Sequence, residues 1–353
     1  MTFSLSGGSL SRGSLSRGSL SRRRFAGGGA AALGAAVFGG RTARAATHAL
    51  DLGVDVPSDH PIGVHLLAAA KAIGAATQGE VRISVFTNNA LGNDTHMLAQ
   101  LRSGALPMMA IGDNILAELV PSAAISNIGF AFKDAGTAFA AMDGAVGDIV
   151  RQDIRKAGLY PMARIWDLGF REITSSTRPI ATPEDMRGFK IRVPPSPISL
   201  SLFRGLGASP LTLNVAELYT ALQTRLADGQ ETPLDTIEVN RYYEVQKYGS
   251  MTNHMWTGYW VLAGAAAWSA LPARLRAAVE GAFNDEAPAE RRASEALNAS
   301  LVPKLRSQGL IINTPDPAPF RAALAKSGFY GHWQAQFGSG LWSALEKYSG
   351  PIA

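Results

Sequence analysis

The chain of 353 residues contains no cysteine. Disulfide bonds, thiolate metal sites and a cysteine nucleophile are therefore excluded, and so is the lipid-modified cysteine of an anchored lipoprotein. The sequence also has no P-loop, no GxSxG motif and no Ser-x-x-Lys motif. No histidine pair has a metal-binding spacing among the six present, His48, His60, His65, His96, His254 and His332. The sequence thus predicts no cofactor, no metal site and no catalytic residue.

Acidic residues are absent from the N-terminal segment. Residues 1–45 hold no Asp, Glu or Lys but seven arginines, and the formal net charge of the whole chain is +5. The other 308 residues therefore carry a net charge of about −2, and the pI near 9.5 reflects the N-terminal segment. No basic surface for nucleic acid is expected.

The N-terminal segment has the order of an export signal. Arg22, Arg23 and Arg24 precede Phe25, an apolar run follows over residues 26–40, and Ala43-Arg44-Ala45 resembles a cleavage site. Residues 1–45 are predicted to be a twin-arginine-type signal peptide cleaved near Ala45, which places the product in the periplasm. The alternative is an uncleaved N-terminal helix, but the apolar run is short and rich in glycine for a membrane span.

The first part of the remaining chain alternates between strand and helix patterns. A buried strand over 49–56 precedes a helical pattern over 63–79, and VRISVF at 81–86 alternates as a strand does. A helix from Asp94 to Ser103 should stop at Gly104, before a short apolar strand at 106–112. This βαβαβ order predicts an α/β lobe.

A second set of the same kind follows. Residues 164–173 and GFKIRV at 188–193 are predicted strands, 196–207 a helix, LTLN at 211–214 a strand, and 216–229 a helix with Leu218, Leu222 and Leu226 on one face. From Trp268 to Leu305 the chain is predicted to be helical, with kinks at Pro288 and Pro303. Such a helix exceeds the diameter of one lobe and would bridge two.

The segment GFKIRVP raises the question of what Arg192 binds. In a strand, Lys190 and Arg192 point to one face while Ile191 and Val193 point to the other. Ligands of open α/β lobes bind beyond the carboxyl ends of the strands, where Arg192 lies. A guanidinium can hold a carboxylate with two parallel hydrogen bonds, and Arg171 could reach the same cleft. The plainer alternative is that both are surface arginines.

Long segments of the chain resemble one known family. WDLGFREITSSTRPI, PEDMRGFKIRVP, LGASPLTLNVAELYTALQTRLADGQETPL and YYEVQKYGSMTNH are similar to the solute-binding subunit of tripartite ATP-independent periplasmic (TRAP) transporters, the DctP-like family. Shorter matches in the same order, among them SDHP, LGND and IGFAFKD, extend the resemblance over nearly all of residues 48–350.

The resemblance implies a two-lobed periplasmic binding protein of the venus-flytrap type, with hinge strands and a long helix across both lobes. Lobe I would comprise 46–168 and 257–296, and lobe II 169–256 and 297–353. Such a receptor, mostly monomeric in the family, closes on a small-molecule carboxylate and delivers it to TRAP permease membrane subunits. It is not an enzyme, is not inserted in the membrane, and binds no nucleic acid.

The resemblance also assigns site residues. Arg192 of KIRVP would be the carboxylate clamp, and Arg171 of GFR a second anchor. Where the family often has asparagine, DGQETP has Thr232, whose shorter hydroxyl makes ligand contact less direct. Asp55 would favour a hydroxyl or amine on the ligand over a second acid group. Asp94, Gly112 and Val215 match further cleft positions. Trp166 and Phe130 are expected either to line the pocket or to lie in the interlobe core.

Two other functions remain open on the sequence. One is a periplasmic enzyme acting on a carboxylate in the same cleft, with Asp55 or Glu217 as the general base. The other is a receptor that feeds a sensor instead of a permease. His254 is expected to be a structural hydrogen-bonding residue, and the acid itself is not identified by the sequence.

Overall fold

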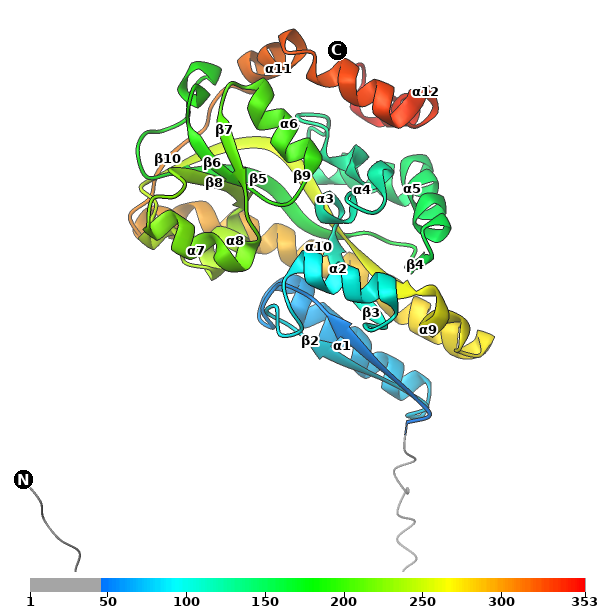
Figure 1. The fold of residues 1–353 in the computed structure, drawn as a ribbon. Coiled ribbons are helices and arrows are strands. Elements are labelled where there is room, and N and C mark those ends of the chain that lie inside the picture. Colours follow the sequence, from blue (N-terminus) through cyan, green and yellow to red (C-terminus); the bar gives the residue numbers. More distant parts are fainter. Residues whose placement is uncertain (1–45, 353) are drawn as a thin grey trace, which may run out of the picture. The chain divides into compact units, whose positions relative to one another are not determined.

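The computed structural model describes residues 46–352, so the predicted signal peptide lies outside the described residues. The fold is a two-lobed α/β architecture in which helices pack on a twisted mixed sheet (Figure 1). The strands run in the order β2-β1-β3-β9-β5-β8-β6-β7, and β4 and β10 each pair with β9. Their bounds are β1 His48–Gly53, β2 Val81–Phe86, β3 Met108–Gly112, β4 Leu159–Pro161, β5 Trp166–Ser175, β6 Lys190–Val193, β7 Ser209–Thr212, β8 Gly229–Pro233, β9 Tyr248–Gly264 and β10 Ile311–Asn313.

Two long strands join the parallel parts of the sheet. β1 is parallel to both β2 and β3, and β6 is parallel to both β7 and β8. β9 spans 17 residues, pairing antiparallel with β3 at its C-terminal part and with β5 along most of its length. The register between β5 and β9 shifts at Asp167/Gly169, where Gly169 has a φ of 109° that other residues rarely adopt. β5 and β9 therefore connect the two parallel parts of the sheet without a break, as hinge strands between two lobes would.

The helices cover the sheet and the cleft. They are α1 Pro61–Ala76, α2 Asp94–Ser103, α3 Asp113–Leu116, α4 Ala135–Asp143, α5 Ala145–Lys156, α6 Pro197–Gly205, α7 Val215–Gln223, α8 Leu234–Val239, α9 Ala265–Ser269, α10 Ala273–Ser307, α11 Pro317–Lys326 and α12 Phe329–Ser349. Short 3-10 turns lie at η1 Pro121–Asn127, η2 Pro183–Met186 and η3 Tyr242–Glu244.

The helix α10 spans both halves of the sheet, as predicted. Its N-terminal part places Leu275, Val279 and Phe283 in the core that contains α1 and β1. Its C-terminal part places Leu301 and Leu305 in a separate core with residues of α7 and α8. Figure 1 shows α10, in orange, passing from α1 toward α8. A rigid element packed on two cores can hold them at a defined separation while the strands bend.

Two local predictions are corrected by the structure. The helix expected over 216–229 ends at Gln223, Arg225 is left-handed with φ 59°, and Leu226 is 58% exposed instead of buried. The chain must turn there to enter β8 parallel to β6. The expected helix from Trp268 is two helices, because Pro272 caps the start of α10. The helix continues through Pro288 and Pro303.

Candidate functional site

A cavity of about 330 Å³ opens at the carboxyl ends of the parallel strands. One part of its wall comes from the loops that follow β1, β2 and β3, and the facing part comes from β5, β6, β8, α7, α8 and η3. This is where open α/β sheets bind ligands, since loop backbones and side chains converge at these ends. Of the predicted site residues, six line the cavity: Asp55, Asp94, Arg171, Arg192, Val215 and Thr232.

Arg192 is a buried cation on the cavity wall, 2% exposed. Its Nε and Nη2 atoms donate to the carbonyl of Leu213, at 2.9 and 2.6 Å, which orients the guanidinium. The outer edge, formed by Nη1 and Nη2, has no ion pair with any described residue. Burial lowers the pKa of Arg192 to about 10, so the side chain remains charged at neutral pH. A buried arginine with an open edge is suited to a planar carboxylate.

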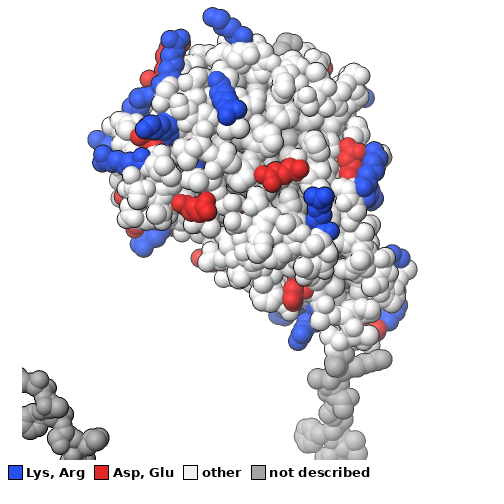
Figure 2. All heavy atoms as spheres, viewed as in Figure 1, with Lys and Arg blue, Asp and Glu red and all other residues white. Residues whose placement is uncertain are grey.

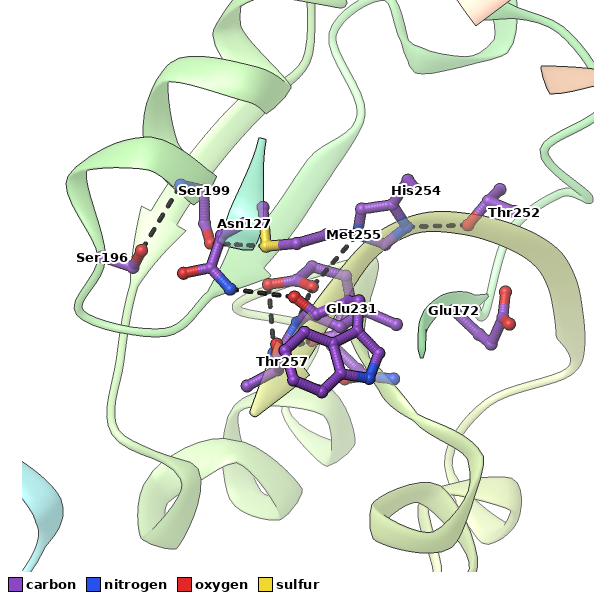
Figure 3. A network of polar contacts seen from close by, with 12 residues as sticks. Asn127, Glu172, Ser196, Ser199, Glu231, Thr252, His254, Met255 and Thr257 are labelled. Carbon is purple, nitrogen blue, oxygen red and sulfur yellow. Dashed lines mark hydrogen bonds and ion pairs between the residues drawn. The ribbon is translucent and has the colours of Figure 1, made fainter. Parts of the chain in front are cut away.

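Arg171 is engaged within the protein. Its Nε and Nη2 atoms contact the carboxylate of Glu231, and Nη2 also donates to the Glu231 carbonyl at 2.9 Å. His254 Nε2 lies 3.2 Å from the same carboxylate, and its Nδ1 lies 2.8 Å from Thr252 Oγ1 (Figure 3). Burial alone would raise the pKa of Glu231, but Arg171 and His254 hold it below its ordinary value. The carboxylate of Glu231 therefore neutralises the charge of Arg171 at the cavity wall. His254 makes structural hydrogen bonds, as the sequence predicted.

The opposite part of the wall carries two carboxylates, that of Asp55, which is half-buried, and that of Asp94, which is buried. Asp55, after β1, accepts the Tyr259 hydroxyl at 2.8 and 3.0 Å through its two oxygens. Burial raises the pKa of Asp55, although the Tyr259 hydrogen bond acts against the rise. Asp94 is the first residue of α2 and is 7% exposed. Burial first, and then repulsion from Asp55, holds the pKa of Asp94 well above its ordinary value.

Sequence reasoning missed several wall residues. His60 accepts the N–H of Ile62 at Nδ1, and its Nε2 donates to Asp235 Oδ2 at 3.0 Å. Since His60 precedes α1 and Asp235 lies in the first turn of α8, this buried pair links the first βα unit to the second part of the sheet. Tyr242, Tyr259, Asn89 and Asn114 also line the cavity. Two of these residues lie in segments that carried the family resemblance, His60 in SDHP and Tyr242 in YYEVQKYGSMTNH, but the other residues had no sequence signal.

Some expected residues are placed elsewhere. Gly112 is not on the wall of the cavity; a Cβ there would lie 2.6 Å from Oδ1 of Asn114, which is on the wall. Trp166 packs in the core with Phe283, and Phe130 with Phe320, which agrees with the core alternative for both. Glu217 is exposed and is not on the wall, so its position does not suit the general base that the enzyme alternative required.

The outer surface offers no sign of a nucleic-acid site in the face that Figure 2 shows, where basic and acidic side chains are scattered among uncharged ones. Within residues 46–352 no three His, Asp or Glu side chains are grouped to hold a metal ion. None of the helices described here is both long and apolar enough to cross a membrane.

Two lobes joined by long strands, with a buried polar cavity at their strand ends, define a ligand-binding protein of the two-lobed periplasmic class. Residues 52–328 match the family model for DctP, described as bacterial extracellular solute-binding protein, family 7. The 2,3-diketo-L-gulonate-binding periplasmic protein YiaO of Escherichia coli is 30% identical over 249 residues, which are 70% of this chain and 76% of YiaO. The chain belongs to the DctP family of TRAP solute-binding proteins, a family of periplasmic transport proteins rather than enzymes.

Solved structures agree with this assignment. The sugar acid binding protein DctPAm from Advenella mimigardefordensis, in complex with galactonate, has a TM-score of 0.81 and 27% identity, covering 87% of this chain and 100% of that one. A TRAP periplasmic solute binding protein from Sulfurospirillum deleyianum with bound succinate has a TM-score of 0.80 and 27% identity, covering 86% of this chain and 99% of that one.

Proposed function

We propose that this chain is an exported receptor that captures a small organic acid and delivers it to a TRAP membrane permease. The signal peptide predicted in residues 1–45 would direct export, with cleavage near Ala45. The observation that carries the proposal is the buried guanidinium of Arg192, whose outer edge is open to the cavity. Relatives that bind galactonate, succinate and 2,3-diketo-L-gulonate support an acid as the ligand.

In this proposal Arg192 is the carboxylate clamp. The carbonyl of Leu213 accepts a hydrogen bond from Arg192, and Leu213 immediately precedes Asn214 and α7. This hydrogen bond therefore links the arginine to the segment that carries Val215. Arg171 acts differently, because Glu231 already neutralises it. Its role is to hold this part of the cavity wall, where its Nη1 donates to Thr257 Oγ1, and to offer a secondary polar contact to the ligand. Binding contacts from both lobes would stabilise the closed form, which the permease recognises.

Two arguments distinguish this function from the alternatives. A general base at Glu217 is disfavoured by its exposure, and one at Asp55 by the Tyr259 hydroxyl, which already donates to both of its carboxylate oxygens. A receptor for a sensor would use the same cavity, and the gene neighbourhood, permease or sensor kinase, separates the two. We expect the receptor to act as a monomer.

The test is a thermal-shift screen of small carboxylates against their amides, followed by calorimetry with the best acid. Saturation at a thousandfold excess over Kd should raise stability by about 4 kcal/mol. Arg192→Ala should weaken binding by about 2 to 5 kcal/mol, because it removes a desolvated charged contact. Lys190→Ala, two residues earlier on β6 and exposed, is the matched control and should leave Kd unchanged. Unchanged affinity in Arg192→Ala would refute the clamp.

A further inference from the structure

Tyr242 places a phenol hydroxyl on the wall of the cavity without a hydrogen-bond partner. The residue is 1% exposed and its hydroxyl is buried, yet no group in residues 46–352 donates to this hydroxyl or accepts from it. A buried hydroxyl that makes no hydrogen bond destabilises a folded protein, and such groups are rare for that reason. The hydroxyl of Tyr242 is therefore suited to a partner that comes from outside the chain.

The backbone is shaped to turn this tyrosine inward. Arg241, the residue before it, is left-handed with φ 58° and ψ 32°, a conformation that residues other than glycine seldom adopt. The ring of Tyr242 is buried in the core that contains Leu218 and Leu222 of α7. The next residue, Tyr243, is half-buried and lies outside the cavity wall, with its hydroxyl 3.5 Å from Arg241 Nε. The turn therefore directs the first of the two tyrosines, and not the second, to the cavity.

Arg192 is the charged group with the strongest influence on the Tyr242 hydroxyl. Burial raises the pKa of Tyr242 above the usual tyrosine value, and the positive charge of Arg192 opposes the rise. The fold explains why the two residues are close. Arg192 donates to the carbonyl of Leu213, two residues before α7, and Tyr242 is buried in the core that α7 covers. The outer edge of Arg192 and the hydroxyl of Tyr242 therefore belong to the same part of the cavity wall.

These two groups need the same kind of partner. A guanidinium has only donors, so Arg192 cannot accept the proton of the Tyr242 hydroxyl. A carboxylate can accept from a guanidinium and from a hydroxyl at once, because each of its oxygens has two lone pairs. A hydrogen bond to a charged acceptor is also about twice as strong as one between neutral groups. The hydroxyl thus adds a strong contact to an acid without adding a second positive charge.

We propose that Tyr242 is a ligand-binding residue whose hydroxyl donates to the carboxylate held by Arg192. The acid is then bound by three donors, two N–H groups from the outer edge of Arg192 and the O–H group of Tyr242. This inference rests on the proposed function, since it assumes that Arg192 holds a carboxylate.

The test is calorimetry of the variant Tyr242→Phe, which removes one oxygen atom and keeps the ring. The probes are succinate, gluconate and the acid that gives the largest shift in the thermal-shift screen. Affinity for the acid that binds the unaltered protein most tightly should fall about tenfold or more, because a hydrogen bond to a charged group is lost. Tyr243→Phe removes the neighbouring hydroxyl, outside the cavity wall, and is the matched control that should leave Kd unchanged. Unchanged affinity in Tyr242→Phe overturns the inference.

The stability of the ligand-free protein separates a binding role from a structural one. Because the hydroxyl makes no hydrogen bond within residues 46–352, Tyr242→Phe should unfold at the same temperature as the unaltered protein or at a higher one. A clearly lower Tm would mean that the hydroxyl supports the fold from within the chain, and the binding role would be overturned.

A second variant tests whether both residues hold the same carboxylate. Arg192→Lys keeps a positive charge but lacks the planar edge with two parallel donors. A carboxylate that shifts in this variant should also lose part of its contact with Tyr242. The fold-loss of affinity caused by Tyr242→Phe should therefore be at least about threefold smaller in the Arg192→Lys background. Equal losses in both backgrounds would mean that Tyr242 contacts another part of the ligand, which overturns the shared site.

The outcomes also separate this inference from the proposed function. Acids that bind through Arg192 but are unaffected by Tyr242→Phe would leave the organic-acid receptor standing and overturn only the role of Tyr242. Amides that bind as well as acids, with no effect of Arg192→Ala, would overturn the clamp and this inference together.

Discussion

Glu231 holds Arg171 in place at the wall of the cavity. Its carboxylate contacts Arg171 and His254, its carbonyl accepts from Arg171, and it is fully buried. An ion pair of this kind does not by itself add much stability, because both charges have been removed from water. Loss of one partner is different, since the remaining charge stays buried and uncompensated.

The variant Glu231→Gln should therefore be destabilised by about 3 kcal/mol and should bind ligand more weakly. The exposed pair Arg241–Glu244 provides the matched control, and Glu244→Gln should change stability by less than about 1 kcal/mol. Urea unfolding of both variants measures the difference. Equal effects would mean that burial of the Arg171–Glu231 pair has no energetic importance.

Single residues of the site were predicted to different extents. Arg192, Arg171 and Asp55 lie on recognisable segments, and the structure brings all three to one cavity. His60, Tyr242 and Tyr259 were not predicted, because a histidine or tyrosine carries no local pattern that marks it as part of a wall. The ion pair between Arg171 and Glu231 could not be predicted from the sequence either, because the two residues are 60 positions apart along the chain.

At the level of elements, α2 is a short helix whose start positions a site residue. Asn93 caps it by accepting the N–H of His96 at 3.0 Å, and Asp94 follows directly. Gly104 ends the helix with φ 80°, as its sequence position predicted. The cap therefore determines where the carboxylate of Asp94 lies.

Replacement of the cap should affect both stability and binding. Asn93→Ala removes the acceptor and should lower the free energy of unfolding by about 1 kcal/mol, with weaker ligand binding because the first turn of α2 loosens. Asn93→Ser keeps a capping oxygen and should retain most of both properties. Thermal unfolding and calorimetry of the two variants test this, and wild-type behaviour of Asn93→Ala would show that the cap is dispensable.

Local patterns predicted some elements and missed others, among them the strongly amphipathic helix α5. β2 and α2 match their predicted bounds, since alternation and caps are local signals. β9 carries no such local signal, because most of its residues are buried on both faces and show no alternation. The helices α4, α5, α11 and α12 and the strands β4 and β10 were not predicted.

The molecule as a whole carries buried carboxylates away from the cavity. Burial raises the pKa of Asp113 to about 6, of Asp167 to about 7, and of Glu172 and Glu290 to about 8. Because these values are higher in the folded state than in the unfolded chain, the stability they contribute is complete at acidic pH and is lost as the pH rises through about 6 to 8. We expect the protein to be more stable at pH 5.5 than at pH 8.

Glu290 offers a direct test of this pH dependence. It accepts the N–H of Asp167 and lies 2.8 Å from Ser294 Oγ, an arrangement that the neutral Gln can reproduce. Glu290→Gln should therefore reduce the loss of stability between pH 5.5 and 8 by about 2 kcal/mol. Glu295→Gln, at an exposed position on the same helix, is the control. The expectation fails if urea unfolding shows the same pH dependence in both variants.

The sequence by itself determined the class of the protein, because two βα sets, a bridging helix and the arginine of KIRVP can be recognised from local order and residue type. Export remains a prediction from the N-terminal segment. The tertiary structure alone decided the chemistry of the cavity. It neutralises Arg171 with Glu231, leaves the outer edge of Arg192 open, and sets Asp94 beside Asp55 without a side-chain donor. Charge, burial and hydrogen bonding depend on distances between residues far apart in the chain, and only the packed fold defines those distances.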